Sequence, residues 1–330
     1  MDLILDKAAS MIFWRKIYPP DRIPMPHFAM PTTDYAINET DAWNCCPSWL
    51  KAELQKDSEA ILHTTVFKAS ERRQSRAHQA HVWAGPIPEG AFYQLKDNVY
   101  IASPEFVFCM AACDLSLHKA IAFGDELCGR YSFDADSERG FRKRKAPLTN
   151  VERIGQFLER AQGVRGKQKA ERALRFLIDN SASPMETFDE MGLSLPYHLG
   201  GYCIDTPTMN EEVPLGAKAA RIAQRATCYA DMCWSDHHLD VEHHGVYDHS
   251  SFSDQASDRA RVNALKEEGF EVIELTKDQV NDLYSFEYIA MRIARITGKR
   301  INKSKLGATS ERLRLRREVF EWNRSYGRIR

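Results

Sequence analysis

The sequence predicts an α/β protein whose C-terminal part is a mixed β-sheet flanked by helices, preceded by a smaller α+β module. Two observations support this prediction. Residues 167–298 alternate between helical patterns and short strand-like runs, as expected for a sheet covered by helices. Residues 61–101 instead contain several β-like runs in succession, separated by turn residues. We therefore expect two units that differ in how strands and helices alternate.

The N-terminal unit is predicted in two parts. Residues 1–55 are rich in proline and aromatic residues and weakly periodic, so we expect an irregular segment that wraps the module of residues 56–140. In that module, strands are predicted at ILHTTVF, AHVWA, AFYQL and VYIAS. A helix is expected to begin at SPEF, because serine caps a helix and proline suits its first turn.

Residues 141–166 are expected to contain a linker and a helix between the two units, because charged residues and glycines concentrate there. The C-terminal unit, residues 167–298, is predicted to follow in this order: a helix from Lys167 to Asp179, a helix starting at SPMET, a strand at YHLGGYCID, strands at YADMCW and LDVEHHG, a helix from Asp254 to Glu268, a strand at FEVIEL and helical residues 277–297. Residues 299–330 are expected to form a basic C-terminal tail.

Composition narrows the class of protein. The 330 residues carry a formal net charge of -1, which argues against a surface coated in cations. No apolar run approaches the roughly 20 residues of a membrane span, and Asp2 and Lys7 interrupt the apolar N-terminus, so we expect a cytoplasmic protein without membrane contact. The eight cysteines include no CxxC pair, which argues against a zinc ribbon and a thioredoxin motif and favours reduced thiols.

Known catalytic motifs are few. The chain has no GxSxG, P-loop, GxGxxG or HExxH motif, so the sequence gives no motif-level support for a serine hydrolase, a nucleoside triphosphatase, a dinucleotide-binding protein or a zincin.

The strands YADMCW and LDVEHHG each carry one carboxylate, Asp231 and Glu242, with the polar turn 235–238 between them. A hairpin brings both side chains to one face of a sheet. Magnesium and other hard cations bind oxygen ligands in such an arrangement, so Asp231 and Glu242 are the predicted metal ligands.

Two basic blocks are candidate phosphate contacts. One includes Arg142, Lys143 and Arg144, and the other is the C-terminal tail, where nine lysines and arginines from Lys303 to Arg330 face three glutamates. The alternative is a solvated helix face or a flexible terminus. A structural zinc site built from Cys228, Cys233 and the nearby histidines is a further hypothesis, although its spacing matches no standard zinc signature.

Several blocks together resemble a known family. SPMET, ADMCW, LDVEHHG, SDRARVNAL and GFEVIELT are similar, in order and spacing, to bacterial proteins related to the very-short-patch repair endonuclease, in the PD-(D/E)XK nuclease superfamily. The resemblance covers about 110 residues, from Gly166 to Val280. The run VYIASPEFVFCMAACDLSLHKAIAFGDEL resembles the C-terminal region of AbiEi-type abortive-infection antitoxins.

The resemblance implies a restriction-endonuclease-like fold and metal-dependent cleavage of DNA. Asp231 and Glu242 would hold Mg²⁺ or Mn²⁺, which polarises the scissile phosphate and lowers the pKa of a bound water. Glu186 would be the third acidic group, although an acidic residue in the first turn of a helix has an equally good structural explanation. Arg259 and Arg261 would contact phosphate, with a salt bridge as the alternative role of this helix's charges.

The sequence departs from the superfamily at His244. The superfamily has lysine two residues beyond the strand glutamate, and these relatives usually have aspartate. Histidine binds metals and transfers protons near neutral pH, so catalytic roles for Glu186, Asp231, Glu242 and His244 stand beside a second hypothesis: a non-cutting DNA-binding regulator or antitoxin-like protein of a phage-defence system. DNA, a second copy in a homodimer and a toxin–antitoxin or defence protein are the expected partners.

Overall fold

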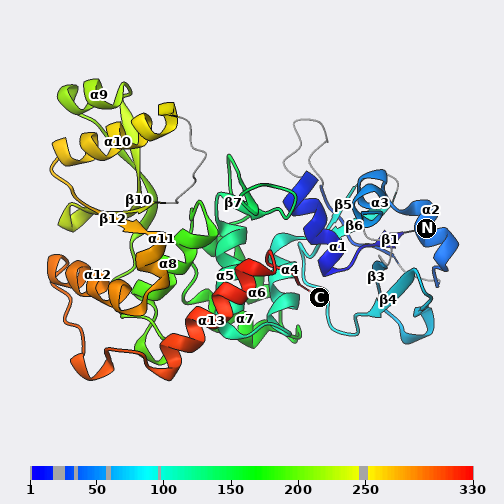
Figure 1. Ribbon diagram of the computed structural model, residues 1–330. Coiled ribbons are helices and arrows are strands. Elements are labelled where there is room, and N and C mark those ends of the chain that lie inside the picture. Colours follow the sequence, from blue (N-terminus) through cyan, green and yellow to red (C-terminus); the bar gives the residue numbers. More distant parts are fainter. Residues whose placement is uncertain are drawn as a thin grey trace.

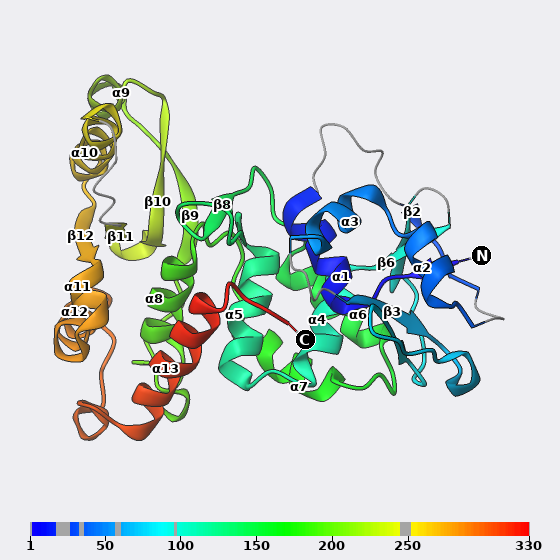
Figure 2. The same cartoon turned by 45° about the vertical axis from the view of Figure 1, so that its right-hand side comes forward.

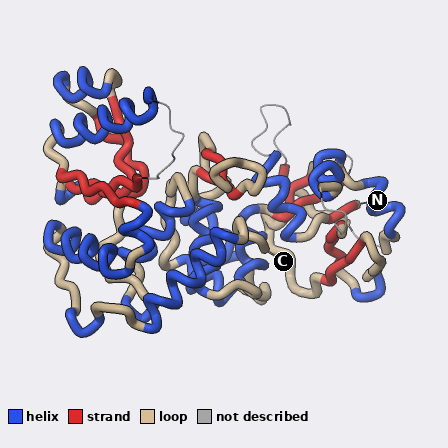
Figure 3. The backbone as a smooth tube through the Cα atoms, in the orientation of Figure 1, coloured by secondary structure: helices blue, strands red, loops and turns tan. Residues whose placement is uncertain are grey.

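The computed structural model describes residues 2–17, 27–32, 36–56, 61–95, 98–244 and 252–329. The side chains of His244 and of residues 252–255 lie outside this description. The fold is mixed α/β, with one four-stranded sheet near each end of an elongated molecule and a helical region between them (Figure 1; Figure 3).

The N-terminal unit contains two sheets. The first has the strand order β1-β6-β5-β2, and the second pairs β3 with β4 in parallel. Their bounds are β1 Leu3–Ile4, β2 His27–Phe28, β3 Leu62–Val66, β4 His78–Val82, β5 Phe92–Gln94 and β6 Val99–Ala102. The four runs predicted between residues 61 and 103 are therefore confirmed as strands.

The described part of residues 1–55 is more regular than expected. It contains β1, α1 (Lys7–Ile12), the π-helical turn η1 (Phe13–Ile17), β2, α2 (Glu39–Cys45) and α3 (Ser48–Leu54). Strand β1 pairs in parallel with β6, and the rings of Phe13 and Trp14 are buried. These elements are short and pack against residues far along the chain, so local periodicity carried little information about them.

The central region is helical. It comprises α4 (Pro104–Ala112), α5 (Leu117–Cys128), the hairpin β7 (Tyr131–Phe133) and β8 (Phe141–Lys143), α6 (Val151–Arg160) and α7 (Lys167–Leu174). The Ser103 hydroxyl caps α4 by accepting the amide of Phe106 at 3.2 Å, as the SPEF motif predicts. In the expected linker, Ile154, Phe157 and Leu158 are buried in the main core.

Gly166 illustrates why glycines gather in this region. It has a φ of +95°, and a Cβ atom there would lie 2.2 Å from the carbonyl oxygen of Cys109. The glycine therefore permits α7 to pack against α4, a close approach that any larger residue would prevent.

The C-terminal unit is built on a mixed sheet with the order β12-β11-β10-β9. Strands β9, β10 and β11 are antiparallel neighbours, whereas β11 and β12 are parallel. The bounds are β9 Thr208–Pro214, β10 Thr227–Trp234, β11 Leu239–His244 and β12 Glu271–Thr276. Helices α8 (Pro184–Ser194), α9 (Ala217–Ala223), α10 (Phe252–Glu267), α11 (Lys277–Asn281) and α12 (Leu283–Ile296) surround it, with α9 beside α10 in both views (Figure 1; Figure 2).

One predicted strand of this unit is wrong. YHLGGYCID contains the 3₁₀ turn η3 (Tyr197–Leu199) and irregular chain. The strand that pairs with β10 on the side away from β11 is β9. Gly200 has a φ of +88°, which is incompatible with an extended strand. Its apolar neighbours Leu199, Tyr202 and Ile204 are buried without a sheet, so their hydrophobicity reports burial only.

The predicted basic tail contains a packed helix. Helix α13 (Ser310–Arg324) lies against α5 and α8, with Leu315, Val319 and Trp322 buried (Figure 2). Arg312 is 3% and Arg316 7% exposed, and their charges serve internal contacts.

All eight cysteines are free thiols. Within the described ranges, no helix is long and apolar enough to cross a membrane.

Candidate functional site

The predicted carboxylate hairpin is formed by β10 and β11. Met232 pairs with Val241 and Cys233 with Asp240, and the same antiparallel register sets Asp231 opposite Glu242. The chain reverses through the 3₁₀ turn η4 (Ser235–His237), which ends at His238 with a φ of +47°. Opposed residues of an antiparallel pair direct their side chains to the same face, so the sheet brings the two carboxylates together.

Arg261 from helix α10 lies between these two carboxylates. Its Nη1 is 3.2 Å from Oδ1 of Asp231, and its Nη2 is 2.5 Å from Oε2 of Glu242. Asp258, which lies on α10 with Arg261, is a third acidic neighbour, and its Oδ1 is 4.0 Å from Nη2. The guanidinium therefore supplies the positive charge of the site and joins β10, β11 and α10.

Glu242 and Asp240 are both buried, at 1% and 0% exposure, and stand two residues apart on β11. Burial, followed by the charges of Asp231 and Asp240, raises the pKa of Glu242 to about 12. Burial and the charge of Asp231 raise the pKa of Asp240 to about 7. Among the described residues, neither side-chain oxygen of Asp240 has a hydrogen-bond partner. The metal-free site therefore retains protons at neutral pH.

Glu186 is the second residue after Pro184 in α8, in the helix's first turn, and its amide is capped by the Ser183 hydroxyl at 3.1 Å. Its Oε2 accepts from the amide of Ala182 at 2.8 Å and from the side-chain amide of Asn210 at 3.1 Å. Burial and then the charge of Asp231 raise the pKa of Glu186 to about 7. Glu186 is therefore electrostatically coupled to the hairpin and also makes the local contacts expected of a helix start.

Asn210 contributes a strained backbone to this arrangement. It lies on β9 with a φ of +50°. It interrupts the pairing of β9 with β10, between the residue pairs Glu211–Ala230 and Met209–Met232. Its amide nitrogen also donates to the carbonyl of Asn180 at 2.9 Å. Asparagine tolerates this left-handed conformation better than most residues, and here the conformation aims the amide at Glu186.

His243 forms a second buried pair behind the hairpin. Its Nδ1 is 2.6 Å from Oδ2 of Asp189 on α8, and its backbone amide donates to Oδ2 of Asp231 at 3.2 Å. Although burial opposes it, the charge of Asp189 raises the pKa of His243. His244 is the last residue of β11, paired with Thr276, and its predicted catalytic side chain lies outside the described residues.

The predicted nucleic-acid contacts fall in different places. Arg259 is exposed on α10, two residues from the inward-facing Arg261. On β8, Lys143 is exposed, whereas Arg142 donates to the carbonyl of Arg15. Just beyond β8, Arg144 donates to the carbonyl of Trp14 at 3.1 Å and to the hydroxyl of Ser132 at 2.9 Å. Arg142 and Arg144 thus tie β8 to the N-terminal segment.

Asp240, Asp189 and Asn210 are site residues that the sequence reasoning missed. A signal for Asp240 was available, because a residue two positions before Glu242 on a strand shares its face. No comparable signal existed for Asp189 or Asn210, which come from other elements. Cys228 and Cys233 belong to an apolar cluster with Leu265, and Sγ of Cys233 is 3.5 Å from the Ser235 hydroxyl at the start of η4. Among the described residues, neither cysteine is part of a compact group of three potential metal ligands, so the hypothesis of a structural zinc site gains no support.

The carboxylates of the hairpin suit a hard divalent cation, because such ions bind oxygen ligands. Among the described residues, both oxygens of Asp240 and Oε1 of Glu242 are buried without a hydrogen-bond partner. In the described part of the chain, however, these carboxylates do not form a compact three-ligand group, and the Arg261 guanidinium stands between Asp231 and Glu242. A cation would therefore have to displace this guanidinium from its ion pairs.

Comparison with protein-family models, with curated proteins and with solved structures gives no match. The site is therefore interpreted from its own geometry and chemistry.

Proposed function

We propose that the protein is a metal-dependent endodeoxyribonuclease with a PD-(D/E)XK-like C-terminal domain. The observation that carries this proposal is the opposition of Asp231 and Glu242 on adjacent strands of a mixed sheet, with Glu186 on α8 coupled to Asp231. Acidic side chains on two adjacent strands are a ligand pattern that a phosphodiester-cleaving metal site would use, and Glu186 would add a third carboxylate from a helix.

Asp231 and Glu242 would hold Mg²⁺ or Mn²⁺, with Asp240 as an additional buried oxygen donor. The ion, when bound, supplies Lewis-acid stabilisation of the scissile phosphate and lowers the pKa of a water. Glu186, whose pKa is raised to about 7 by burial and then by the charge of Asp231, would be the third acidic group and would orient that water. Arg259, which is exposed on α10, and Arg261, once released from the carboxylates, would contact phosphate oxygens.

A second candidate function is favoured by Arg261 itself. A guanidinium paired with both proposed ligands gives the carboxylates a permanent counter-charge without any metal. The protein would then be a DNA-binding regulator that keeps a nuclease-like fold without cleavage. In either case we propose that residues 56–140 form an AbiEi-like module and that DNA or a defence protein is the partner.

The deciding experiment incubates the purified full-length protein with supercoiled plasmid and short duplexes in Mg²⁺, Mn²⁺ or EDTA. The variants are Asp231→Ala, Glu242→Ala and the double substitution. Glu212→Gln is the matched control, because Glu212 is an exposed carboxylate on β9 of the same sheet.

Cleavage by the parent and by Glu212→Gln in metal, and by neither Ala variant, is the expected result. Equal cleavage by the Ala variants would reject the site. Salt-sensitive DNA retention by parent and variants alike, without cleavage in any cation, would reject the nuclease proposal in favour of the regulator.

A further inference from the structure

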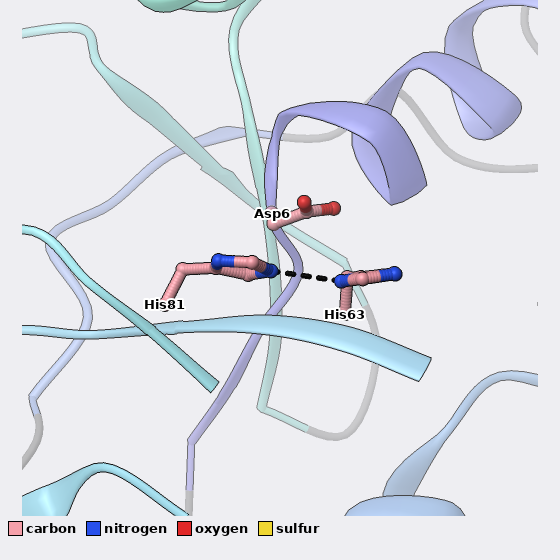
Figure 4. A group of neighbouring side chains, drawn as sticks. All are labelled: Asp6, His63 and His81. Atoms are coloured by element: carbon pink, nitrogen blue, oxygen red, sulfur yellow. Dashed lines mark hydrogen bonds between the residues drawn. The ribbon is translucent and has the colours of Figure 1, made fainter. Parts of the chain in front are cut away.

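A second group of potential metal ligands lies in the N-terminal unit, in a different part of the chain from the carboxylate hairpin. Asp6 follows β1, His63 is on β3 and His81 is on β4, and one ligand atom of each lies within 4.8 Å of the others (Figure 4). Nδ1 of His63 is 2.8 Å from Nε2 of His81, and the two rings are stacked with their centroids 5.0 Å apart. Among the described residues, this is the one group of three such side chains with so compact an arrangement.

The parallel pairing of β3 and β4 explains how the two imidazoles meet. His63 pairs with Gln79, and Thr65 pairs with His81, so the histidines occupy diagonal positions on one face of the sheet. That face is partly exposed, whereas Leu62 and Ala80 on the other face are buried. Diagonal neighbours on a sheet face are close enough for ring side chains to touch.

Asp6 is brought to the histidines by backbone contacts. Leu5 forms an isolated antiparallel bridge with Thr64, and the amide of Asp6 donates to the carbonyl of His63 at 3.4 Å. One carboxylate oxygen, Oδ1, caps α1 by accepting the amide of Ala9 at 2.8 Å. The other oxygen is left for a ligand, and the cap fixes the orientation of the carboxylate.

We propose that Asp6, His63 and His81 bind a divalent transition-metal ion such as Zn²⁺. Two imidazoles and one carboxylate are ligands that such ions prefer, whereas Mg²⁺ prefers oxygen alone. Zinc–nitrogen bonds of about 2.0–2.1 Å at a tetrahedral angle hold two nitrogens about 3.3 Å apart. The two ring nitrogens are 2.8 Å apart, about 0.5 Å closer than that spacing.

Three protein ligands leave at least one coordination position for water or another ligand. His81 is exposed and borders a cavity of about 310 Å³ that Asp6 and Trp83 also line. Lys7 lines the same cavity, and its ammonium is paired with Asp114. The metal would therefore be accessible to solvent and would link β1, β3 and β4.

The test titrates Co²⁺ into the full-length protein and follows its visible absorption, with Zn²⁺ as the competitor. We expect one bound equivalent to give the ligand-field bands of nitrogen and oxygen ligation, without the thiolate charge-transfer band that the free cysteines would produce. His63→Gln and His81→Gln should each weaken binding by at least about tenfold, since even loss of supporting contacts around a metal site has an effect of that size. Asp6→Asn should also weaken binding while keeping the helix cap.

His198→Gln is the matched control, because His198 is an exposed histidine outside the group, and Asp231→Asn tests independence from the carboxylate hairpin. Both should retain the parent's ligand-field bands, which report on the histidine site and not on the total number of Co²⁺ ions bound. Circular dichroism of each variant establishes that it folds. The proposal is overturned if folded His63→Gln and His81→Gln bind as the parent does, if the spectrum is that of thiolate ligation, or if the parent binds no Co²⁺.

Discussion

The guanidinium of Arg261 lies 2.5 Å from Oε2 of Glu242, a carboxylate that is 1% exposed on β11. A single arginine on α10 therefore pairs with a deeply buried carboxyl group among the proposed metal ligands. Because the same guanidinium also contacts Asp231, a metal ion bound by both carboxylates would have to displace it.

Replacing Arg261 by glutamine should strengthen metal binding. Without the competing guanidinium, the affinity for Mn²⁺ at about pH 8 should rise by about tenfold, equivalent to about 1.4 kcal/mol. The metal-free variant should also unfold at a lower temperature, because buried carboxylates lose their counter-charge. Titration calorimetry and thermal unfolding measure the two effects. Arg259→Gln, an exposed change on the same helix, should alter neither, and unchanged Mn²⁺ affinity in Arg261→Gln would rule out competition.

The metal-free protein should lose stability as the pH rises through about 7. Burial raises the pKa of both Glu186 and Asp240 from their ordinary values to about 7. A carboxyl with a raised pKa in the folded state stabilises the fold below its unfolded pKa, and this contribution is lost as pH rises through the folded value. The unfolding temperature in EDTA should therefore fall between about pH 5 and about pH 8.

The Asp240→Asn variant tests how much of this pH dependence comes from Asp240. The amide has no charge to bury, so the variant should show a shallower fall in unfolding temperature with pH than the parent. Asp236→Asn, in the exposed turn η4, should retain the parent's slope. Identical slopes for parent and Asp240→Asn would show that Asp240 does not hold its proton in the folded state.

Glu318 should stabilise the protein at neutral pH and lose this effect in acid, unlike Glu186 and Asp240. Burial tends to raise its pKa, but hydrogen bonds from Arg314, Ser116 and His118 lower it from 4.5 to about 2. A depressed pKa gives stability that is present above the unfolded value and is lost as pH falls toward the folded value. Glu318→Gln should therefore cost about 2 kcal/mol of unfolding free energy at neutral pH.

The difference between parent and Glu318→Gln should shrink as the pH falls from about 4.5 toward about 2, as measured by urea denaturation at each pH. Glu321→Gln is the control on the same helix, because its ion pair with Lys119 is solvent-exposed and worth under about 1 kcal/mol. A pH-independent loss in Glu318→Gln would assign the effect to packing alone.

Trp322 should be essential to the stability of the C-terminal helix. It is 2% exposed and contacts the rings of Phe123 and Phe133, so Trp322→Ala should lower the unfolding free energy by about 3–5 kcal/mol. Leu313→Ala on the same helix removes a side chain that is 51% exposed and should change stability by under about 0.5 kcal/mol. Denaturant unfolding compares them, and similar losses would mean that α13 is not packed as described.

The sequence by itself determined the elements whose signals are local. The SPEF and SPMET starts, the β10–β11 hairpin and strand β12 are all visible in capping residues, turns and alternation. The opposition of Asp231 and Glu242 follows from the length of the turn between two strands, so spacing was sufficient to predict it.

Only the tertiary structure decided which distant side chains meet these elements. The basic residues of 299–330 predicted a tail, yet Arg312 is buried against Tyr202 and Glu287, because a long cationic side chain can be absorbed by an aromatic ring and a carboxylate. Arg261 and Arg259 are two residues apart in one helix, so they lie on different faces of it. Only the packing of α10 against the sheet decides that Arg261 is the one that faces the carboxylates. Likewise, Asp6 meets His63 and His81 only through strand pairing across more than fifty residues, a relationship that no local pattern encodes.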